Sequence, residues 1–237
     1  MNDLFKETFS FKDSQCTIIA DKQIGITIAQ ESIKRNRQQL EEFIKENPKF
    51  LWTLTPFPIP LSPPVAKLMA EAAAKANVGP MAAVAGVLAD LATKDMVDSG
   101  CAVAVVEDGG EVSAVSNVSV DIVVVAGDEP LSRRLGFRLS EFPIGVATSS
   151  GQFSHALSFG DAEAVTVFCG NAGLADAAAT AVCNVVKGED IDAAITRGIE
   201  LAKGIVGVEG VLIFYHDHVG TWGKIPQIIE VDPLSTS

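Results

Sequence analysis

Short apolar runs alternate with longer alanine-rich segments along most of this chain, and this alternation limits the fold more than any other feature. A run of about six apolar residues bounded by turn residues predicts a strand, whereas a longer amphipathic segment predicts a helix. Asp108-Gly109-Gly110 joins the run 101–107 to a returning strand at 111–115, because Asp-Gly favours a hairpin turn. Strands paired by hairpins, with helices between the pairs, predict an α+β fold with largely antiparallel sheets and alanine-rich helices packed on them.

The other elements follow from the same patterns. Strands are predicted at 120–126, 163–169, 209–216 and 225–231, and in 142–151 ahead of a turn at 148–151, with a hairpin of two strands over 15–28. Helices are predicted over 31–46, 63–77, 80–98, 173–187 and 190–205, and 128–140 is predicted to be irregular. Residues 80–115 and 173–222 share the order helix, strand, turn and strand, which suggests an internal duplication. No linker separates two halves, so we expect a single domain over 1–237.

Charge and hydropathy restrict the partners of this chain. Its net charge of −12 repels both a nucleic-acid backbone and an anionic membrane surface. No apolar run reaches the ~18 residues of a membrane span, and the N-terminus lacks the layout of a signal peptide. The four cysteines form no Cys-x-x-Cys pair, which indicates buried thiols in a reducing compartment. We therefore expect a soluble cytoplasmic protein that binds neither nucleic acid nor membrane, with a homodimer as the default assembly.

Two pairs of side chains are candidates for binding a metal. Asp176 and Thr180 lie four residues apart, so they project from one face of an alanine-rich helix. A carboxylate is costly to bury there without a cation, and Mg²⁺ accepts carboxylate and hydroxyl oxygens together with phosphate and water. The alternative is that Asp176 lies in the first helical turn, where the helix dipole favours acids. His216 and His218 share one face of a strand end, but no third ligand is near them in the sequence.

Two turns are candidates for binding a small phosphate-bearing ligand. In Asp108-Gly109-Gly110-Glu111 the glycines allow a close approach, and the acids could orient a ribose or a hydrated metal; a plain hairpin is the alternative. In Thr148-Ser149-Ser150-Gly151, hydroxyls and amides that follow a strand suit phosphate oxygens. The alternative for this second turn is a polar turn bonded to its own backbone.

Titratable and basic side chains close to these turns complete the candidate set. His155 is the only plausible general acid or base in its stretch, although a lone histidine is more often structural. Arg133, Arg134 and Arg138 form a basic run in an otherwise acidic chain. This run predicts either a clamp on phosphate or a set of surface salt bridges.

The order of the motifs carries more information than any single motif. They occur as Asp108-Gly109-Gly110-Glu111, Ala147-Thr148-Ser149-Ser150-Gly151, His155, and Ala175-Asp176-Ala177-Ala178-Ala179-Thr180-Ala181. This order resembles the ApbE family of flavin transferases, which move FMN from FAD onto a protein threonine or serine using magnesium. The chain is similar in particular to a smaller, uncharacterised ApbE-like family of bacteria and archaea, through 78–86, Ser116-Asn117, 130–136, 148–151 and 174–177.

The resemblance covers about residues 78–187, and we expect it to extend over the whole chain. It implies the ApbE-like α+β fold. It also implies that Asp176 and Thr180 bind Mg²⁺ and that His155 lies beside the reacting phosphate. FAD or a related nucleotide would then lie near Gly109 to Glu111, Asn117 and the turn 148–151.

The chain also departs from the ApbE pattern. His155 is followed by Ala-Leu-Ser-Phe, where ApbE proteins have Ile-Ile-Asp-Pro, and the segment 84–86 lacks their lysine. Three hypotheses therefore stay open. The first is magnesium-dependent transfer or hydrolysis at a phosphate of FAD or a related ligand. The second is a non-catalytic module that binds a flavin or another small metabolite, and the third is a structural or partner-docking protein.

Overall fold

The computed structural model describes residues 4–59, 61–123, 135–151 and 160–230. Its strands are β1 (Phe5–Phe11), β2 (Ser14–Ala20), β3 (Val103–Asp108), β4 (Glu111–Ser116), β5 (Val120–Val123), β6 (Leu135–Leu139), β7 (Ile144–Ser149), β8 (Ala164–Cys169), β9 (Val208–Tyr215), β10 (His218–Gly223) and β11 (Gln227–Glu230). Its helices are α1 (Gln23–Glu46), α2 (Lys49–Trp52), α3 (Pro64–Ala76), the short 3-10 helix η1 (Pro80–Ala83), α4 (Val84–Asp98), α5 (Ala172–Val185) and α6 (Ile191–Gly204).

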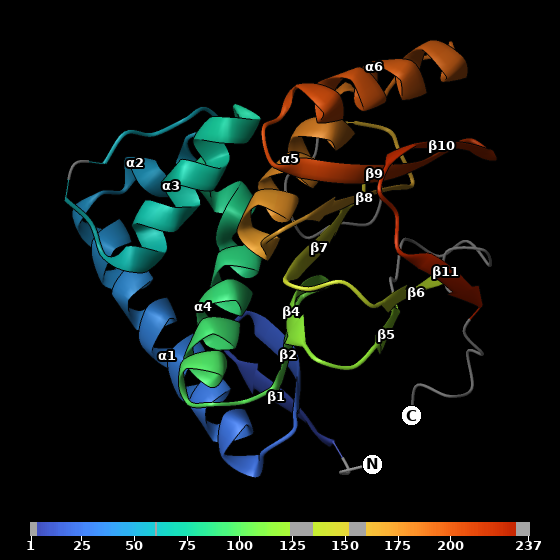
Figure 1. The fold of residues 1–237 in the computed structure, drawn as a ribbon. Helices are drawn as coiled ribbons and strands as arrows, with labels where there is room; N and C mark the ends of the chain where they lie inside the picture. The colour runs from blue at the N-terminus through green and yellow to red at the C-terminus, as the bar shows by residue number, and fades with distance from the viewer. Residues whose placement is uncertain (1–3, 60, 124–134, 152–159, 231–237) are drawn as a thin grey trace.

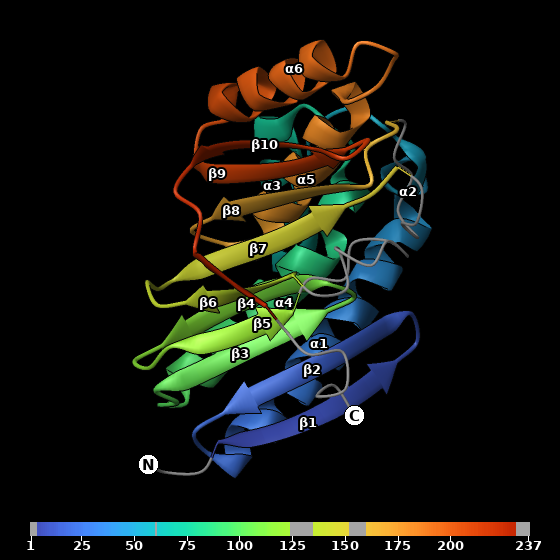
Figure 2. The same ribbon diagram turned by 90° about the vertical axis from the view of Figure 1, so that its right-hand side faces the viewer.

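An antiparallel sheet of eight strands, in the order β1-β2-β3-β4-β7-β8-β9-β10, forms the centre of the molecule. The helices cover one face of this sheet, and a sheet of three strands in the order β11-β6-β5 covers part of the other face (Figures 1 and 2). Phe137 of β6 packs edge-on against Phe168 of β8, with ring centroids 5.0 Å apart, which joins the two sheets. The predicted α+β fold with largely antiparallel sheets and alanine-rich helices is therefore confirmed.

The alanine-rich helices α4 and α5 cross at two glycines, and each helix caps the other. A Cβ atom on Gly86 would lie 2.3 Å from the backbone oxygen of Ala172, so the small residues allow the backbones to touch. Asp90 of α4 accepts hydrogen bonds from the N–H groups of Ala172 (2.9 Å) and Gly173 (2.8 Å) at the start of α5. Asp176 of α5 accepts one from the N–H of Gly86 (3.1 Å) in the first turn of α4. These bonds satisfy helix-terminal donors that have no partner within their own helix.

The hairpin predicted over 15–28 is wrong in its second half. β2 pairs with β1, which precedes it, and α1 already begins at Gln23. The alternation of isoleucines in 24–28 is typical of a strand, but Ile26, Ala29 and Ile33 are buried at helical spacing. Packing of this apolar stripe against α4 overrides the strand preference of the β-branched residues.

Two further segments differ from the prediction. Residues 135–139, predicted to be irregular, form β6 in the middle of the small sheet, where β5 and β11 supply its hydrogen bonds. His216 and Asp217 form a turn with positive φ between β9 and β10, so the two histidines do not share a strand face. β10 corresponds to the second strand expected at the end of the segment 173–222. The internal duplication and the single domain stay predictions.

All four cysteines, each in the described part of the chain, are buried and outside disulfides, as predicted. Within the described ranges no single helix is long and apolar enough to cross a membrane, and α3 with the segment 80–98 passes that test only as a pair bent by 102°.

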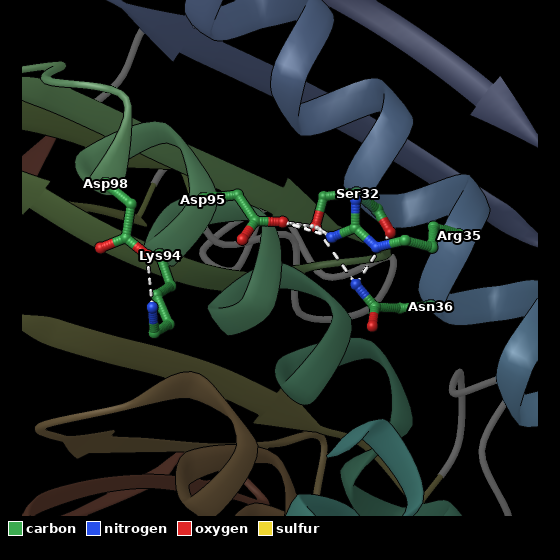
Figure 3. A network of polar contacts seen from close by, with 6 residues as sticks. All are labelled: Ser32, Arg35, Asn36, Lys94, Asp95 and Asp98. Atoms are coloured by element: carbon green, nitrogen blue, oxygen red, sulfur yellow. Dashed lines mark hydrogen bonds and ion pairs between the residues drawn. The ribbon is translucent and has the colours of Figure 1, made fainter. Parts of the chain in front are cut away.

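A hydrogen bond from the buried hydroxyl of Ser32 to the carboxylate of Asp95 connects α1 to α4 (Figure 3). Asp95 of α4 accepts hydrogen bonds from Ser32 (2.5 Å) and from Arg35 (2.6 Å) of α1. Ser32 is fully buried, whereas more than half of the Arg35 side chain is exposed. We expect Asp95→Ala to lower the free energy of unfolding by about 1–2 kcal/mol, because it leaves a buried hydroxyl without its acceptor. Arg35→Ala should cost less than about 0.5 kcal/mol.

Urea denaturation of both variants checks this ranking, with Asp98→Ala, which breaks the exposed pair with Lys94, as the control (Figure 3). Equal losses in Asp95→Ala and Arg35→Ala would show that the ion pair, and not the buried hydroxyl, carries the stabilisation.

Candidate functional site

Most residues predicted to bind metal or phosphate meet at one end of the large sheet. Asp108 is the last residue of β3 and lies opposite Glu111, the first residue of β4. β7 neighbours β4 in an antiparallel register and ends at Ser149, at this same end of the sheet. The turn between β3 and β4 has left-handed φ angles of 67° at Gly109 and 113° at Gly110, which explains the two glycines.

The side chains of these strand ends point to the face that the helices cover. Val112 of β4 and Val146 of β7 belong to the core beneath the small sheet. Side chains alternate along a strand, so Glu111 and Ser149 lie on the opposite, helical face. Asp108 lies on that face too, because its alternate neighbours pack against α1 and α4.

Helix α5 carries Asp176 and Thr180 over this strand end. The start of α5 touches Gly145 of β7, since a Cβ there would lie 2.1 Å from the nitrogen of Ala172. The end of α5 touches Gly160, just before β8, through the backbone oxygen of Cys183. α5 therefore runs along β7. A helix rises about 1.5 Å per residue, so Thr180 lies about 12 Å beyond Ala172. A strand rises about 3.3 Å per residue, so Ser149 lies about 13 Å beyond Gly145, and Thr180 and Ser149 are at a similar level.

Three acids at this end disfavour one another's charge. Burial raises the pKa of Asp176 from 3.8 to about 7, and the negative charges of Asp108 and Asp90 contribute to this rise. A hydrogen bond from the Gly86 amide lowers the pKa but does not offset burial. Burial also raises the pKa of Glu111 well above its ordinary value, and the charges of Asp176 and Asp108 raise it further. The pKa of Asp108 is raised by burial and lowered in part by a hydrogen bond from Ser14. A bound cation would relieve this repulsion.

The donor set fits a magnesium ion that keeps several waters. Asp176 supplies a carboxylate and Thr180 a buried hydroxyl one turn later on the same helix. Within the described residues, no three His, Cys, Asp or Glu side chains come close enough together to hold a metal ion, so Asp108 and Glu111 do not form one metal site with Asp176. Other oxygens, such as those of water and ligand, would complete the coordination. The sequence argument that Asp176 needs a cation is too strong, because the Gly86 amide already stabilises its carboxylate.

Two buried side-chain atoms stand out because they have no hydrogen-bond partner among the described residues: Ser149 Oγ and Arg37 Nε. Ser149 is only 5% exposed, so its hydroxyl is withdrawn from solvent. Buried polar atoms of this kind are rare in native proteins, and a ligand is one of their ordinary explanations. Sequence reasoning missed Arg37, since nothing local distinguishes it from the exposed Arg35 on the same helix.

Other predicted residues do not join this group. Thr148 faces the small sheet and shares a hydrogen bond of 2.9 Å with Thr166. Asn117 follows the far end of β4 and is exposed, so the structure does not bring it near Glu111. Ser150 is buried beside Ser149, and the amide of Gly151 donates to Ala162 (2.9 Å).

The predicted basic and titratable groups are spread over the chain. His155, Arg133 and Arg134 lie outside the described residues. Arg138 forms a two-pronged ion pair with Asp121 in the small sheet (2.8 and 2.7 Å), so the salt-bridge alternative is correct for Arg138.

A cavity of about 480 Å³ lies elsewhere, at the start of α5, where Asp90, Ser113 and Lys75 contribute to its walls. This cavity does not coincide with the acid cluster (Asp108, Glu111, Asp176). We assign the candidate site to the acid cluster, because acids with raised pKa values and the unpartnered Ser149 Oγ lie at the same end of the sheet.

The state of Ser149 leads to a stability prediction. Ser149→Ala should leave the free energy of unfolding unchanged or raise it by up to about 1 kcal/mol, because it removes a buried hydroxyl that has no partner. Ser14→Ala is the matched control: its hydroxyl donates to buried Asp108 (3.0 Å), and we expect a loss of about 1–2 kcal/mol. Denaturant titration of the ligand-free variants measures both; similar losses would mean that Ser149 is satisfied within the fold.

The chain is similar to a known protein family and to curated proteins of archaea. The model of a family described as AbpE bacteria matches residues 7–202. A UPF0280 protein of Methanococcus vannielii is 38% identical over 235 residues, which cover 97% of this chain and 95% of that protein. A UPF0280 protein of Methanopyrus kandleri is 39% identical over 224 residues, or 93% of this chain and 91% of the relative.

Solved structures show the same fold at low identity. The flavinyl transferase ApbE of Pseudomonas stutzeri, in its apo form, matches with a TM-score of 0.55 and 15% identity over 93% of this chain and 94% of its own. The ApbE protein of Thermotoga maritima matches with a TM-score of 0.54 and 15% identity over 98% of both chains. The resemblance to an uncharacterised ApbE-like family is therefore confirmed, as is the ApbE-like fold.

Proposed function

This chain belongs to the AbpE bacteria family, and we propose that it binds a flavin nucleotide or a related phosphate-bearing ligand with Mg²⁺ and cleaves or transfers at the phosphate. The observation that carries the proposal is that the acid cluster lies at the same end of the sheet as Ser149 Oγ, a buried hydroxyl without a partner among the described residues. The fold shared with a flavinyl transferase supports a flavin as the first ligand to test.

Each group of the candidate site has a proposed role. Asp176 and Thr180 would hold the Mg²⁺, which would supply positive charge against the charge that develops on the phosphate. The open turn at Gly109 and Gly110 lets the ligand approach the backbone, and Ser149 donates its hydroxyl proton to a phosphate oxygen. Glu111 would accept a hydrogen bond from a hydroxyl of the ligand and orient it.

The proton and charge at the reacting phosphate need further groups. His155 is proposed to accept the proton of the attacking water or hydroxyl, and Arg133 to stabilise the phosphate. With FAD, breaking the P–O–P bond releases AMP and leaves the FMN phosphoryl group on water or on an acceptor hydroxyl.

The second candidate is a module that binds a flavin or another small metabolite without converting it. The departures after His155 and in 84–86 favour it, since ApbE proteins carry an Asp-Pro pair where this chain has Ser158-Phe159, and a lysine that 84–86 lacks. The two candidates share the site and differ only in turnover.

Incubation of the purified chain with FAD, in MgCl₂ or in EDTA, tests the proposal. Chromatography follows FMN and AMP, mass spectrometry follows covalent flavin, and calorimetry follows binding. We expect Mg²⁺-dependent binding and product in the wild type, and a loss of about a hundredfold or more in Asp176→Asn. Thr180→Val should lose most of the Mg²⁺ effect, whereas Thr180→Ser, which keeps the hydroxyl, should retain it.

Binding without any conversion would select the metabolite-binding module. Equal behaviour of Thr180→Val and Thr180→Ser would remove Thr180 from the metal site, and full turnover in Asp176→Asn would remove the enzymatic proposal. The proposal also includes a cytoplasmic location and a homodimer, and light scattering on the purified chain measures the latter.

A further inference from the structure

The cavity of about 480 Å³ at the start of α5 is separate from the acid cluster. It lies between α3 and α4, and each helix lines it with one stripe at helical spacing: positions 68, 71, 72 and 75 of α3, and positions 87, 90, 93, 94 and 97 of α4. Ser113 and Val115 of β4 line it from the sheet below. Small-molecule sites have volumes of about 300–1,000 Å³, so this cavity is large enough for a metabolite.

Apolar side chains from the helices and from the sheet form one wall of the cavity. They are Leu68, Val87, Val97, Val115 and Leu174. Leu68 is 38% exposed, so the fold leaves a large apolar side chain of this wall partly uncovered. An apolar group of a ligand would cover it and gain from its burial.

Asp90 is a largely buried carboxyl group in the cavity lining, without a cationic partner among the described residues. Its oxygens accept hydrogen bonds from the amides of Ala172 (2.9 Å) and Gly173 (2.8 Å). Burial raises the pKa of Asp90, these two bonds and one from Ser113 lower it, and no described cation contributes. A carboxylate offers about four acceptor sites, so a further donor can bind from the cavity. A cationic donor would also offset the cost of burying this charge.

Lys75 brings a positive charge to the same cavity. It is exposed, in the last turn of α3, and forms no ion pair with a described residue. The other lysine and the glutamate of the two stripes already have partners, which are Asp98 for Lys94 and Lys67 for Glu71. The flexible four-carbon stem of Lys75 lets its ammonium group turn toward the cavity.

The thiol of Cys169 lies within range of both charges. Burial raises the pKa of Cys169 to about 12, the negative charges of Glu209 and Asp90 add to the rise, and the positive charge of Lys75 opposes it. Cys169 is the last residue of β8 and precedes Gly170, which lines the cavity. The cavity therefore combines an apolar wall with one negative and one positive group that act on the same region.

We propose that this cavity binds a small zwitterion with an apolar side chain, such as an apolar α-amino acid, whose ammonium group donates to Asp90 and whose carboxylate accepts from Lys75. An apolar anion would be repelled by Asp90 and an apolar cation by Lys75, so neither is as complementary. The first amides of α5 are not an anion site, because Asp90 and Asn171 already accept from them. This site shares no residue with the acid cluster and does not depend on the proposed function.

Phenylalanine and two analogues that each lack one charge isolate the two contacts: hydrocinnamate lacks the ammonium group, and phenethylamine lacks the carboxylate. NMR titration gives the Kd of each for the wild type, Lys75→Met and Asp90→Asn, with folding checked by circular dichroism. Lys45→Met, also in the last turn of a helix, is the matched control. In the wild type we expect each analogue to bind about tenfold more weakly than phenylalanine.

The two variants should show opposite patterns. Lys75→Met should weaken phenylalanine and hydrocinnamate by about five- to tenfold, and phenethylamine by less than about twofold. Asp90→Asn should weaken phenylalanine and phenethylamine but not hydrocinnamate, and Lys45→Met should match the wild type.

Equal affinity of the wild type for all three ligands, or equal weakening of all three in Lys75→Met, would overturn the proposal. A wild type that binds neither phenylalanine nor leucine at millimolar concentration would overturn it too. If Asp90→Asn does not fold, Lys75→Met still decides, because Lys75 is exposed. All these outcomes leave the assignment of the acid cluster unchanged.

Discussion

Gly86→Ala is expected to lower the free energy of unfolding by about 3 kcal/mol or more, although alanine favours a helix over glycine by about 1 kcal/mol. The added Cβ would lie 2.3 Å from the oxygen and 2.5 Å from the carbonyl carbon of Ala172, and 2.8 Å from the nitrogen of Gly173. These are backbone atoms at the crossing of α4 and α5, so they cannot turn away as the end of a side chain would. The helices must separate, which also weakens the bond from the Gly86 amide to Asp176.

Gly204→Ala is the matched control for this effect. Gly204 is also helical, at the end of α6, and a Cβ there would meet no atom within 4 Å. We expect a change of less than about 0.5 kcal/mol. Urea titrations with equal m-values compare the two variants. A Gly86→Ala protein as stable as the wild type would show that α4 and α5 do not cross in contact at this residue.

Asp176→Asn is expected to stabilise the metal-free protein at pH 8 by about 2 kcal/mol or more. The folded carboxyl has a pKa of about 7 and the ordinary value is 3.8, so the folded state holds the proton more tightly than the unfolded state does. The stability that this proton contributes is complete below pH 3.8 and is lost as the pH rises through 7. Asparagine is uncharged at every pH and can still accept from the Gly86 amide.

Thermal or urea unfolding in EDTA, at steps from pH 4 to pH 8, measures the difference between the two proteins. The advantage of the asparagine variant should grow from near zero at the acid end to a plateau at about pH 7. Added Mg²⁺ should then raise the stability of the wild type alone. A wild type that is more stable than Asp176→Asn at pH 8 in EDTA would show that the carboxylate is well stabilised without metal.

Much of the fold could be predicted because local pattern and packing agree. The turn at Gly109 and Gly110 has the backbone that only glycine adopts readily. α3 ends at Ala76, one residue before the predicted end, and Asn77 caps it in the left-handed conformation. The errors have tertiary causes. α1 begins at Gln23 despite its alternating isoleucines. β6 lies within the segment 128–140, whose polar residues predicted irregular structure, but its apolar residues pair with two neighbouring strands.

The candidate site was predictable to the extent that chain order and strand register determine it. Asp108, Glu111 and Ser149 end neighbouring strands, and helical spacing places Asp176 and Thr180 together. Pattern alone did not show that Thr148 faces the small sheet or that Asn117 is at the far end of β4. Arg37 was missed because its burial depends on the distant start of β2.

The exchange of caps between α4 and α5 has a consequence for how this protein assembles. If either helix docked alone, it would leave a carboxylate in the apolar layer with no amide to accept from, either Asp90 or Asp176. Neither docking step is therefore favourable by itself, and the pair should form and open as one cooperative unit. In native-state hydrogen exchange the amide of Gly86 and those of Ala172 and Gly173, far apart in the chain, should share one opening free energy.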